Sequence, residues 1–541
     1  MNGLEETNKL LPWFLLDDDP EKLYKTRTYL SVDFETDNEE TGSPLHEPND
    51  LVLACWQVYD QDGKLLKKQH KFGGIYEMQE LLDDIHSVDF IIAHNLKFEL
   101  QWLRRCGLDL HDVLGYDTML AQWVIDGNRK GKGFLRKLGY LCRKYGLPGK
   151  MDLVSTLIAL GVNTRDIPPS WLLEYCYADV EAAKDLFLAQ QKELTEKNLW
   201  HMVHVRNLTC SVLSDIEFEG MQLDSSRVEE EYRQAIKIRD ELGAKLAVMT
   251  GGINLNSPKQ LAVYLYDKLG LDEPKDYRGK PIRTGKGERT ANANALALLK
   301  PYTDEQRLFL ATYKDYNKQV SLLEKNLDYF KLCCEQREGV FRGLLKQNVV
   351  QTHRLASGGI PIIFKGLKKS KSVQLQNIPR EYKGLFWSGD GDWVVLEADS
   401  SQLEFRVAVD LGKDKVGYEE IVNGVDIHSY TAKVLLDNGD DEITGLPENK
   451  RRQESKKHTF RPLYGGGSGS PALVAYCEFF KDKYKGISST QRNWALKTVD
   501  KKQFTTPYGM IFYFPNTKMQ KSGYITNSTS IYNYPINKIV A

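Results

Sequence analysis

Residues 29–38 read "YLSVDFETDN", a stretch that is typical of a β-strand. Asp33 and Glu35 lie two positions apart in it, so both carboxylates point to the same face of the strand. Two like charges this close are unfavourable when partly buried unless a cation lies between them, and hard divalent ions such as Mg²⁺ take oxygen ligands. The pair therefore suggests a metal site, although Asp-x-Glu in a strand is more often solvent-facing.

The sequence around this strand alternates short apolar runs with helical periodicity from residue 28 to 200. "LVLACWQVYDQDGKLLKKQHKF" (51–72) predicts two strands joined by a hairpin turn at "QDGK". "VDFIIAHN" (88–95) predicts another strand, which leads into the helix "LKFELQWLRRC". The pattern predicts a sheet with helices packed on it.

The pattern changes along the rest of the chain. From about 205 to 345 it is long, charged and helical, which predicts a helical arm or second domain. A mixed region follows, with a strand expected at 392–399, a basic helix near 450–461 and a glycine turn at 464–470. At 541 residues, the chain is long enough for three or four domains of roughly 150 residues each.

The composition is that of an ordinary globular protein, with 41% hydrophobic and 27% charged residues. The longest apolar runs fall far short of the roughly 20 residues that a membrane span needs, so no membrane partner is expected. Eight cysteines without Cys-x-x-Cys spacing indicate thiols of a reducing cytoplasm, neither a disulfide framework nor a zinc site. We therefore expect a cytoplasmic protein.

The formal net charge is −1, so a nucleic-acid partner would have to be held by local basic patches. "FKGLKKSKS" (364–372) carries four lysines and no acid, and "NKRRQESKKHTFR" (449–461) carries six Lys or Arg against one Glu. Taken alone, each stretch is more often a solvated surface than a binding site.

Two further stretches strengthen the case for a metal site. In "AHNLKFELQWL", Asn95 and Glu99 are four apart and are expected on one helix face, as are Tyr175 and Asp179 in "EYCYADVEAAKDLF". Together with the two strand acids, in this order and spacing, these residues resemble the exonuclease motifs of the proofreading DEDD superfamily, in its tyrosine-bearing branch. The likeness covers about residues 28–195.

This resemblance implies a catalytic role for each acid. Asp33, Glu35 and Asp179 would hold two Mg²⁺ ions, and Tyr175 would orient the water that attacks the terminal phosphodiester. The family usually has Asp at the position of Glu99. That longer side chain is either a catalytic carboxylate that reaches an ion through water or a solvated helix residue.

A second constellation lies in "DWVVLEADSSQLEFRVAVDL" (392–411). A buried apolar strand is expected to end on Asp399, and a capping box from Ser401 to Glu404 is expected to begin the next helix. An acid at the end of a buried strand can present its carboxylate in a cleft, although a turn acid is the more frequent case.

Support comes from "RRQESKKHTFRPLYGGGSG", in which Arg452, Lys456 and Phe460 recur every four residues. They drift by only about 40° per step and so line one stripe of a helix. Two cations and an aromatic ring suit a triphosphate with its stacked base, although an exposed basic helix with one core phenylalanine has the same pattern. Pro462 is expected to end or kink this helix.

These two stretches resemble motifs A and B of family A DNA polymerases. "LQNIP", "THRLAS", "DIHSYTA" and "NLNSPKQL" resemble further stretches of that family, in the family's order, between residues 28 and 536. The resemblance implies an α/β and α+β multidomain fold, with an RNase H-like exonuclease domain followed by a right-hand polymerase that has a helical thumb, a partial palm and helical fingers. It also implies template-directed DNA synthesis with proofreading in DNA replication, on primer-template DNA and dNTPs.

The same resemblance implies roles for the residues of the second constellation. Asp399 would bind both catalytic Mg²⁺ ions of the polymerase site, so that each active site uses two ions. Glu404 would block a ribose 2′-hydroxyl, and Arg354 would track the primer duplex. The other nucleotide-binding residues would be His428, Arg452, Lys456, Phe460 and Tyr464, and the other DNA-binding residues Asn95, Asn377 and Asn533.

The resemblance also implies a division of the chain. We expect a lead at 1–27, the exonuclease domain at 28–200, the thumb at 201–345, the first part of the palm at 346–425, the fingers at 426–520, and the start of the returning palm at 521–541. With no nuclease-like segment before residue 28, the chain is more similar to the compact polymerases of bacteriophages than to the larger bacterial repair enzyme.

Family members carry a later palm strand with a His-Asp-Glu triplet, whose aspartate is the second metal ligand, and no such triplet occurs in the sequence. The likeness stops at Asn537 within "SIYNYPINKIVA", so the rest of the palm is expected to be missing, as in a split or truncated gene. Autonomous polymerase activity is therefore doubtful. The alternatives are a chain that works only as an exonuclease, and a DNA-binding subunit completed by a separately encoded C-terminal palm fragment. A processivity factor is a further candidate partner.

Overall fold

The computed structural model describes residues 19–46, 48–109, 111, 113–148, 152–275, 279–359, 373–387 and 394–540. The lysine-rich stretch 364–372 lies outside these residues. The chain divides into two compact units: the first contains Met1–Glu219, Leu345–Ser357 and Glu397–Ala541, and the second Gly220–Leu344 and Gly358–Leu396. Within the described residues, none of the helices combines the length and apolar character that crossing a bilayer requires.

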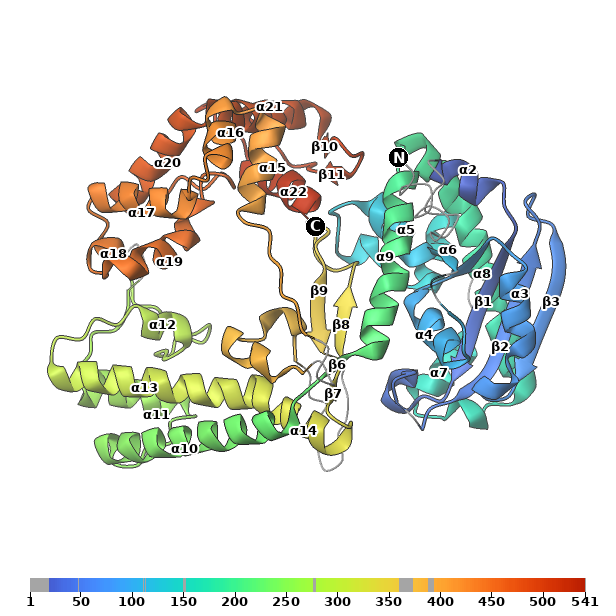
Figure 1. Cartoon of the computed structure of the whole chain (residues 1–541), viewed down its shortest axis with the longest axis horizontal. Coiled ribbons are helices and arrows are strands. Elements are labelled where there is room, and N and C mark those ends of the chain that lie inside the picture. The colour runs from blue at the N-terminus through green and yellow to red at the C-terminus, as the bar shows by residue number, and fades with distance from the viewer. Residues whose placement is uncertain are drawn as a thin grey trace. The chain divides into compact units, whose positions relative to one another are not determined.

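A five-stranded mixed sheet with the strand order β3-β2-β1-β4-β5 organises the amino-terminal part of the first unit (Figure 1). β1 pairs antiparallel with β2 and parallel with β4, β2 pairs antiparallel with β3, and β4 pairs parallel with β5. The predicted strands and the hairpin between β2 and β3 are confirmed. The bounds are β1 Tyr29–Thr36, β2 Leu51–Tyr59, β3 Leu65–Phe72, β4 Phe90–Ala93 and β5 Leu114–Asp117.

Helices cover both faces of this sheet, because alternate residues of β1 enter different cores. Leu30, Val32 and Phe34 pack with α3 and α4, whereas Tyr29 packs with α5, α8 and α9. The helices are α2 Pro20–Lys25, α3 Gln79–His86, α4 Lys97–Arg105, α5 Thr118–Asp126, α6 Leu138–Tyr145, α7 Asp152–Ala159, α8 Pro169–Lys197 and α9 Trp200–Glu219. Asp33 and Glu35 have the same parity as Tyr29, and they share its face of the strand as predicted.

The second unit is mainly helical, as the sequence predicts for this part of the chain. α10 and α13 pack along each other around Leu246, Phe309 and Tyr313. The bounds are β6 Met221–Gln222, α10 Ser225–Thr250, α11 Pro258–Val263, α12 Ala293–Ala297, α13 Asp304–Leu322, α14 Asp328–Gln336 and β7 Val340–Phe341. β6 pairs antiparallel with β7. A further two-stranded sheet consists of β8 (Gly343–Lys346) and β9 (Ala356–Gly359), each of which contains residues of both units.

The carboxyl-terminal part of the first unit is a cluster of helices with one short hairpin. α15, α21 and α22 pack side by side, and α17 packs on α19 (Figure 1). The bounds are α15 Leu403–Gly412, α16 Lys415–Val422, α17 Ile427–Asp437, α18 Asp441–Thr444, α19 Glu448–Thr459, α20 Pro471–Lys483, α21 Lys485–Lys501, β10 Gln503–Thr505, β11 Ile511–Tyr513 and α22 Ser528–Val540.

The hairpin β10–β11 joins this cluster to the five-stranded sheet. Phe504, Met510 and Phe512 belong to the same core as Tyr29 and Phe187. The Asn128 side chain donates a hydrogen bond to the Tyr513 carbonyl at 3.0 Å and accepts one from the Tyr513 amide at 2.6 Å. The hairpin and the five-stranded sheet, although distant in sequence, therefore share one apolar core and are joined by the two hydrogen bonds between the Asn128 side chain and the Tyr513 backbone.

The expected buried strand at 392–399 is wrong for the residues that the structure describes. Residues 394–400 are extended chain outside any strand, and Val394 and Leu396 are more than four-fifths exposed. An apolar run becomes a buried strand only when a neighbouring strand satisfies its backbone groups, and among the described residues no strand pairs with this segment.

The start of the next helix also differs from the prediction, whereas the end of the basic helix agrees with it. α15 begins after Gln402, which has a positive φ of 54° and no side-chain capping bond, so the capping box from Ser401 to Glu404 does not form. α19 ends at Thr459, and Phe460 to Tyr464 form turns around Pro462. Proline cannot continue the helical hydrogen-bond ladder, so the helix stops where predicted.

Candidate functional site

The two acids of β1 form a cluster with a cysteine of α8. Among the described residues, ligand atoms of Asp33, Glu35 and Cys176 all lie within 4.8 Å of one another. Cys176 Sγ is 3.4 Å from the Asp33 carbonyl oxygen and 3.6 Å from Asp33 Oδ2. Glu35 is buried and Asp33 is half-buried. Two carboxylates therefore face the same helix in a partly buried setting.

α8 carries the other two predicted residues of this cluster. Tyr175 and Asp179 are one turn apart and are 6% and 5% exposed. The register of α8 on β1 is fixed next to them, because Ser31 Oγ donates a hydrogen bond to the Val180 carbonyl at 2.9 Å. The structure thus brings Asp33, Glu35, Tyr175 and Asp179 to one sheet–helix junction.

Glu99 is buried, and the expectation that it shares a helix face with Asn95 is wrong. Asn95 is exposed, precedes α4 and has a φ of +72°. Its backbone N–H donates to Asp117 Oδ1 at 3.1 Å, an acceptor that also caps α5 through Met119 and Leu120. The turn held by Asp117 takes Asn95 out of the helix, while Glu99 in the first turn of α4 points inward.

The electrostatic setting of Glu99 is that of an uncompensated carboxylate. Burial, and then the nearby charge of Asp33, raises its pKa well above the ordinary value. Within the described part of the chain, Glu99 Oε2 is buried without a hydrogen-bond partner. Burial also raises the pKa of Asp117 to about 6. A buried acid beside another acid is favourable in its ionised form only when a positive charge is added.

A cavity of about 730 Å³ opens at the end of β1, beside these acids. Glu35 lines it together with Phe34, Phe98 and Asn163. It therefore presents one carboxylate of the cluster next to aromatic rings and an amide, a combination that suits a nucleotide with its base and phosphate.

The donor set fits a hard divalent cation such as Mg²⁺. Asp33 and Glu35 supply carboxylate oxygens that lie close together, and the buried, unpartnered Glu99 Oε2 is a further oxygen that a cation could satisfy. Because carboxylates repel one another in a partly buried site, a bound cation would lower that repulsion.

A second group of predicted residues meets near the start of α15. Arg354 Nη2 donates to Glu404 Oε1 at 3.0 Å. Tyr464 lies beside this ion pair: burial, with the charge of Glu404, raises its pKa to about 12, and a hydrogen bond with Asn537 opposes the shift. Asn537 Nδ2 also donates to Asn533 Oδ1 at 2.9 Å, within α22. Two helices, α15 and α22, and two loop segments of the first unit thus contribute to one polar cluster.

The residues of α19 divide into paired and free cations. Arg452 donates to both carboxylate oxygens of Asp426, at 2.5 and 3.1 Å. Burial disfavours the Asp426 charge, but the hydrogen bonds from Arg452 and Ser429 outweigh it and lower the pKa of Asp426 to about 2. Lys456 is exposed, and in the described structure it makes no ion pair. Asp426 therefore holds the predicted triphosphate ligand Arg452.

The helix that follows Asp426 carries the remaining predicted nucleotide residue. His428 is buried and shares a hydrogen bond with Thr459 at 2.9 Å, and its ring meets that of Phe460 edge-on at 5.5 Å. Burial lowers the pKa of His428. His428 and Phe460 therefore form a neutral, mostly apolar contact behind the cations of α19.

Two predicted residues remain apart from these clusters. Asp399 is exposed on the extended segment before α15, and within the part of the chain that the structure describes it makes no hydrogen bond or ion pair with Glu404 or Lys456. Asn377 is exposed in a 3₁₀ turn of the second unit. For both residues, the structure gives the position in the fold but no partner that supports the expected role.

Sequence reasoning missed several residues at these sites. Cys176, Phe98 and Asn163 line or touch the first cluster, and Asn537 joins the second. Cys176 follows Tyr175 directly, so the α8 stretch carried a signal for it. The family likeness ends at Asn537, so the sequence gives no signal for this residue, and its place on α22 brings it to Tyr464.

Comparisons with known proteins match two families to successive parts of the chain. The family described as "DNA polymerase family A" matches residues 225–537, and the family described as "3′-5′ exonuclease" matches residues 15–195. DNA polymerase I of Aquifex aeolicus is 25% identical over 457 residues, which cover 82% of this chain and 70% of that protein. DNA polymerase I of Chloroflexus aurantiacus is 28% identical over 386 residues, or 69% of this chain. The chain spans only 38% of the length of that relative.

The fold is similar to that of a solved structure, the POL domain of Pol1 from M. smegmatis in complex with DNA primer-template and dNTP. The match covers 96% of this chain and 86% of that one, with a TM-score of 0.69 and 18% sequence identity. The polymerase family model alone spans more than half of the chain. The chain therefore belongs to DNA polymerase family A, with a 3′–5′ exonuclease domain ahead of its polymerase domain.

Proposed function

We propose that this chain is a DNA-directed DNA polymerase of family A with a 3′–5′ proofreading exonuclease, and that it acts in DNA replication. The observation that carries the exonuclease part is the cluster of Asp33 and Glu35 beside α8, with the buried and uncompensated Glu99 next to it. Family membership supports the polymerase part. Primer-template DNA and dNTPs are the proposed partners, because the M. smegmatis relative is in complex with both.

In the exonuclease site, Asp33, Glu35 and Asp179 would hold Mg²⁺, two ions in all, with Glu99 as a more distant carboxylate. Bound Mg²⁺ would stabilise the negative charge that develops on the phosphate during hydrolysis. Tyr175 orients the attacking water through its hydroxyl. Phe34 and Phe98 give the terminal base apolar surface in the cavity next to Glu35, and Asn95 contacts the strand from the exposed turn before α4.

In the polymerase site, Asp399 would be the Mg²⁺ ligand, and the residues around α19 would bind the nucleotide. Lys456 and Arg452 neutralise the triphosphate, Phe460 and Tyr464 shape the pocket for the base, and His428 supports Phe460 from behind. Glu404 excludes a 2′-hydroxyl. Arg354, Asn377 and Asn533 contact DNA. Phosphoryl transfer in such a site depends on positioning and on charge stabilisation.

We retain the expected domain division as part of this proposal, with the exonuclease domain at 28–200, the thumb at 201–345, the first part of the palm at 346–425, the fingers at 426–520 and the returning palm from 521. We also propose that the chain is an enzyme of bacteriophage type that works in the cytoplasm of a bacterial host. This setting is compatible with eight cysteines that are all free thiols.

The second palm carboxylate decides whether extension occurs. The 541 residues contain no His-Asp-Glu triplet, the motif expected to supply it. We therefore propose that these residues alone shorten a primer and do not lengthen it, because extension needs a second palm carboxylate from outside them. A processivity factor is a further proposed partner.

A primer assay on a denaturing gel tests both activities at once. The substrate is a labelled primer on a longer template, with Mg²⁺ and all four deoxynucleotides. Asp62→Ala is the control, because Asp62 lies in the exposed hairpin turn of the same domain. The exonuclease site is supported if the primer is shortened by the wild type and by Asp62→Ala but not by Asp33→Ala. Lengthening that stops in Asp399→Ala would contradict the proposed need for a second palm carboxylate from outside these residues. A primer that stays unchanged would contradict the exonuclease proposal.

A further inference from the structure

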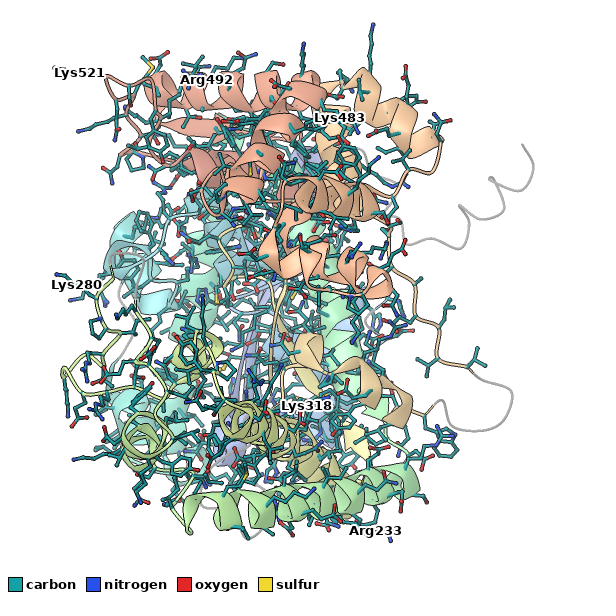
Figure 2. The ribbon with its side chains drawn as sticks, turned by 90° about the vertical axis from the view of Figure 1, so that its left-hand side faces the viewer. Arg233, Lys280, Lys318, Lys483, Arg492 and Lys521 are labelled. Atoms are coloured by element: carbon teal, nitrogen blue, oxygen red, sulfur yellow. The ribbon has the colours of Figure 1, made fainter. Side chains whose placement is uncertain are left out.

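The segment from α21 to the start of α22 is strongly basic in a chain that is almost neutral. Residues 485–527 contain one acid, Asp500, and seven cations: Lys485, Arg492, Lys497, Lys501, Lys502, Lys518 and Lys521. The net charge of the whole chain is −1. Figure 2 labels Arg492 and Lys521, which are both exposed in this segment. Such an excess of one sign creates a local potential that attracts anions.

A cavity of about 350 Å³ lies within this segment, between α21 and β10. Trp494, Lys497 and Lys501 line its helical wall at positions i, i+3 and i+7, which lie on one face of α21. The residues Gln503–Thr505 of β10 and Pro507 form the other wall. No carboxylate lines the cavity, so its charged groups are all positive.

The floor of this cavity is aromatic. The rings of Trp494 and Phe504 lie with their centroids 5.1 Å apart, and Trp494 is only half-buried. Tyr508 follows the lining residue Pro507 at the tip of the β10–β11 hairpin and is 62% exposed. Exposed aromatic surface beside cations is the combination that single-stranded nucleic acid uses, because bases stack on rings while phosphates meet lysines.

The two lysines of the cavity are available for a ligand. Both are exposed, and in the described residues neither Lys497 nor Lys501 makes an ion pair. Lys483, by contrast, is held by Glu420 at 2.6 Å. Because Lys497 and Lys501 are one helical turn apart, a flexible strand can place successive phosphates against them.

We propose that this cavity, named here the α21 groove, binds single-stranded DNA. Lys497 and Lys501 contact phosphates, and an unpaired base stacks on the exposed part of Trp494, whose ring packs against the buried Phe504. A duplex would not satisfy the groove, because its bases are already stacked and paired. None of the residues assigned to the exonuclease or nucleotide sites lines it, so the groove is an additional contact and does not depend on either proposed activity.

Fluorescence anisotropy of labelled DNA, in EDTA so that no hydrolysis occurs, tests the groove. The full chain is compared with Lys497→Ala/Lys501→Ala and with a matched control, Lys481→Ala/Lys485→Ala. Both control lysines are exposed, and Lys485 begins the same helix about 18 Å away. The probes are a blunt duplex, duplexes with a (dT)12 overhang at the 5′ or the 3′ end, and free (dT)12.

We expect the full chain to bind DNA with an overhang more tightly than the blunt duplex. At 0.1 M salt, the groove variant should bind the overhang DNA roughly 10- to 30-fold more weakly than the full chain, whereas the control variant should keep its affinity. The slope of log Kd against log salt should fall by about 1.4, or 0.7 for each lost phosphate contact. A gain with the 5′ overhang identifies the template strand as the ligand, and a gain with the 3′ overhang identifies an unpaired primer end. Equal binding by the groove variant and the control overturns the proposal.

The base contact is tested separately with an overhang of the same length made of abasic residues. This strand keeps the charge and loses the bases, so no aromatic residue of the core has to be replaced. We expect the full chain to bind it several-fold more weakly than (dT)12, and the groove variant to discriminate less between the two. If the full chain binds both overhangs equally, or if polyglutamate competes as well as (dT)12, the groove is a general anion surface and the proposal is wrong.

Discussion

The Sγ atom of Cys176 lies 3.6 Å from Oδ2 of Asp33, inside the proposed exonuclease site. Burial raises the pKa of this thiol well above its ordinary value, so Cys176 is a neutral side chain and a weak hydrogen-bond donor. It is therefore placed to orient Asp33 and not to carry charge.

This placement predicts a small effect of Cys176→Ala. We expect the rate of single-strand degradation in Mg²⁺ to remain within about threefold of the wild type, because only a weak hydrogen bond is lost. Asp33→Ala, in the same assay, should lose at least about a hundredfold. A Cys176→Ala loss as large as that of Asp33→Ala would make the thiol a direct participant.

We expect the exonuclease rate to be less affected by shortening the Glu99 side chain than by removing its charge. In Glu99→Asp the charge is kept, and the shorter acid is the one expected from the family resemblance, so we predict an exonuclease rate within about tenfold of the wild type. Glu99→Gln keeps the size and loses the charge, and we predict a greater loss together with a higher Mg²⁺ concentration at half-maximal rate. If a Mg²⁺ titration shows Glu99→Gln to be unchanged, Glu99 is only a buried helix residue.

A substitution at Gly127 tests how closely α5 and the β10–β11 hairpin pack against each other. Gly127 has a φ of +64° at the end of α5, and a Cβ added there would lie 2.4 Å from the Ile511 carbonyl oxygen. Gly146 ends α6 with a φ of +68° and has open space around it, so it provides a matched control. Both alanine variants carry the cost of a left-handed backbone, and only Gly127→Ala adds a clash.

We expect Gly146→Ala to lower the free energy of unfolding by about 1 kcal/mol and Gly127→Ala by about 1 to 3 kcal/mol more. Denaturant midpoints followed by tryptophan fluorescence measure the difference. Equal midpoints for the two variants would mean that the hairpin moves away from α5 at little cost.

The amino-terminal sheet was predictable because its strands carry their own pattern. Asp33 and Glu35 share a face by the two-residue period alone, and the hairpin between β2 and β3 follows from the turn residues "QDGK". Pro462 ends α19 through its missing N–H, a property of the residue itself. In each case the local chemistry agrees with the fold around it.

The sequence predictions are wrong where the local structure depends on residues that are distant along the chain. Asn95 lies outside the helix because its N–H donates to Asp117, 22 residues later. The periodicity of the sequence does not predict that hydrogen bond. The apolar run around Val395 has strand propensity, but among the described residues no strand lies beside it, so it stays extended and exposed. The pairing of Asn128 with Tyr513 spans 385 residues and has no sequence signal. Propensity is local, whereas pairing and capping are settled by tertiary structure.

The ion pair of Arg452 with Asp426 should stabilise the first unit in a pH-dependent manner. Asp426 has a folded-state pKa of about 2, below its ordinary value of 3.8. Because the folded-state pKa is the lower one, the stabilisation is fully present above about pH 4 and is lost as the pH falls toward 2. Arg452→Ala should therefore reduce the free energy of unfolding by about 1 kcal/mol at pH 7, a modest value because both side chains are partly exposed.

The difference between the wild type and Arg452→Ala should stay constant from pH 7 to pH 5 and shrink between pH 4 and pH 3, as measured by denaturant titration at each pH. Lys456→Ala is the matched control, since it removes a cation from the next turn of α19 that makes no ion pair in the described structure. We expect the control to show no such change with pH. A constant Arg452→Ala difference down to pH 3 would mean that the arginine stabilises α19 by packing against α17 and not through the Asp426 charge.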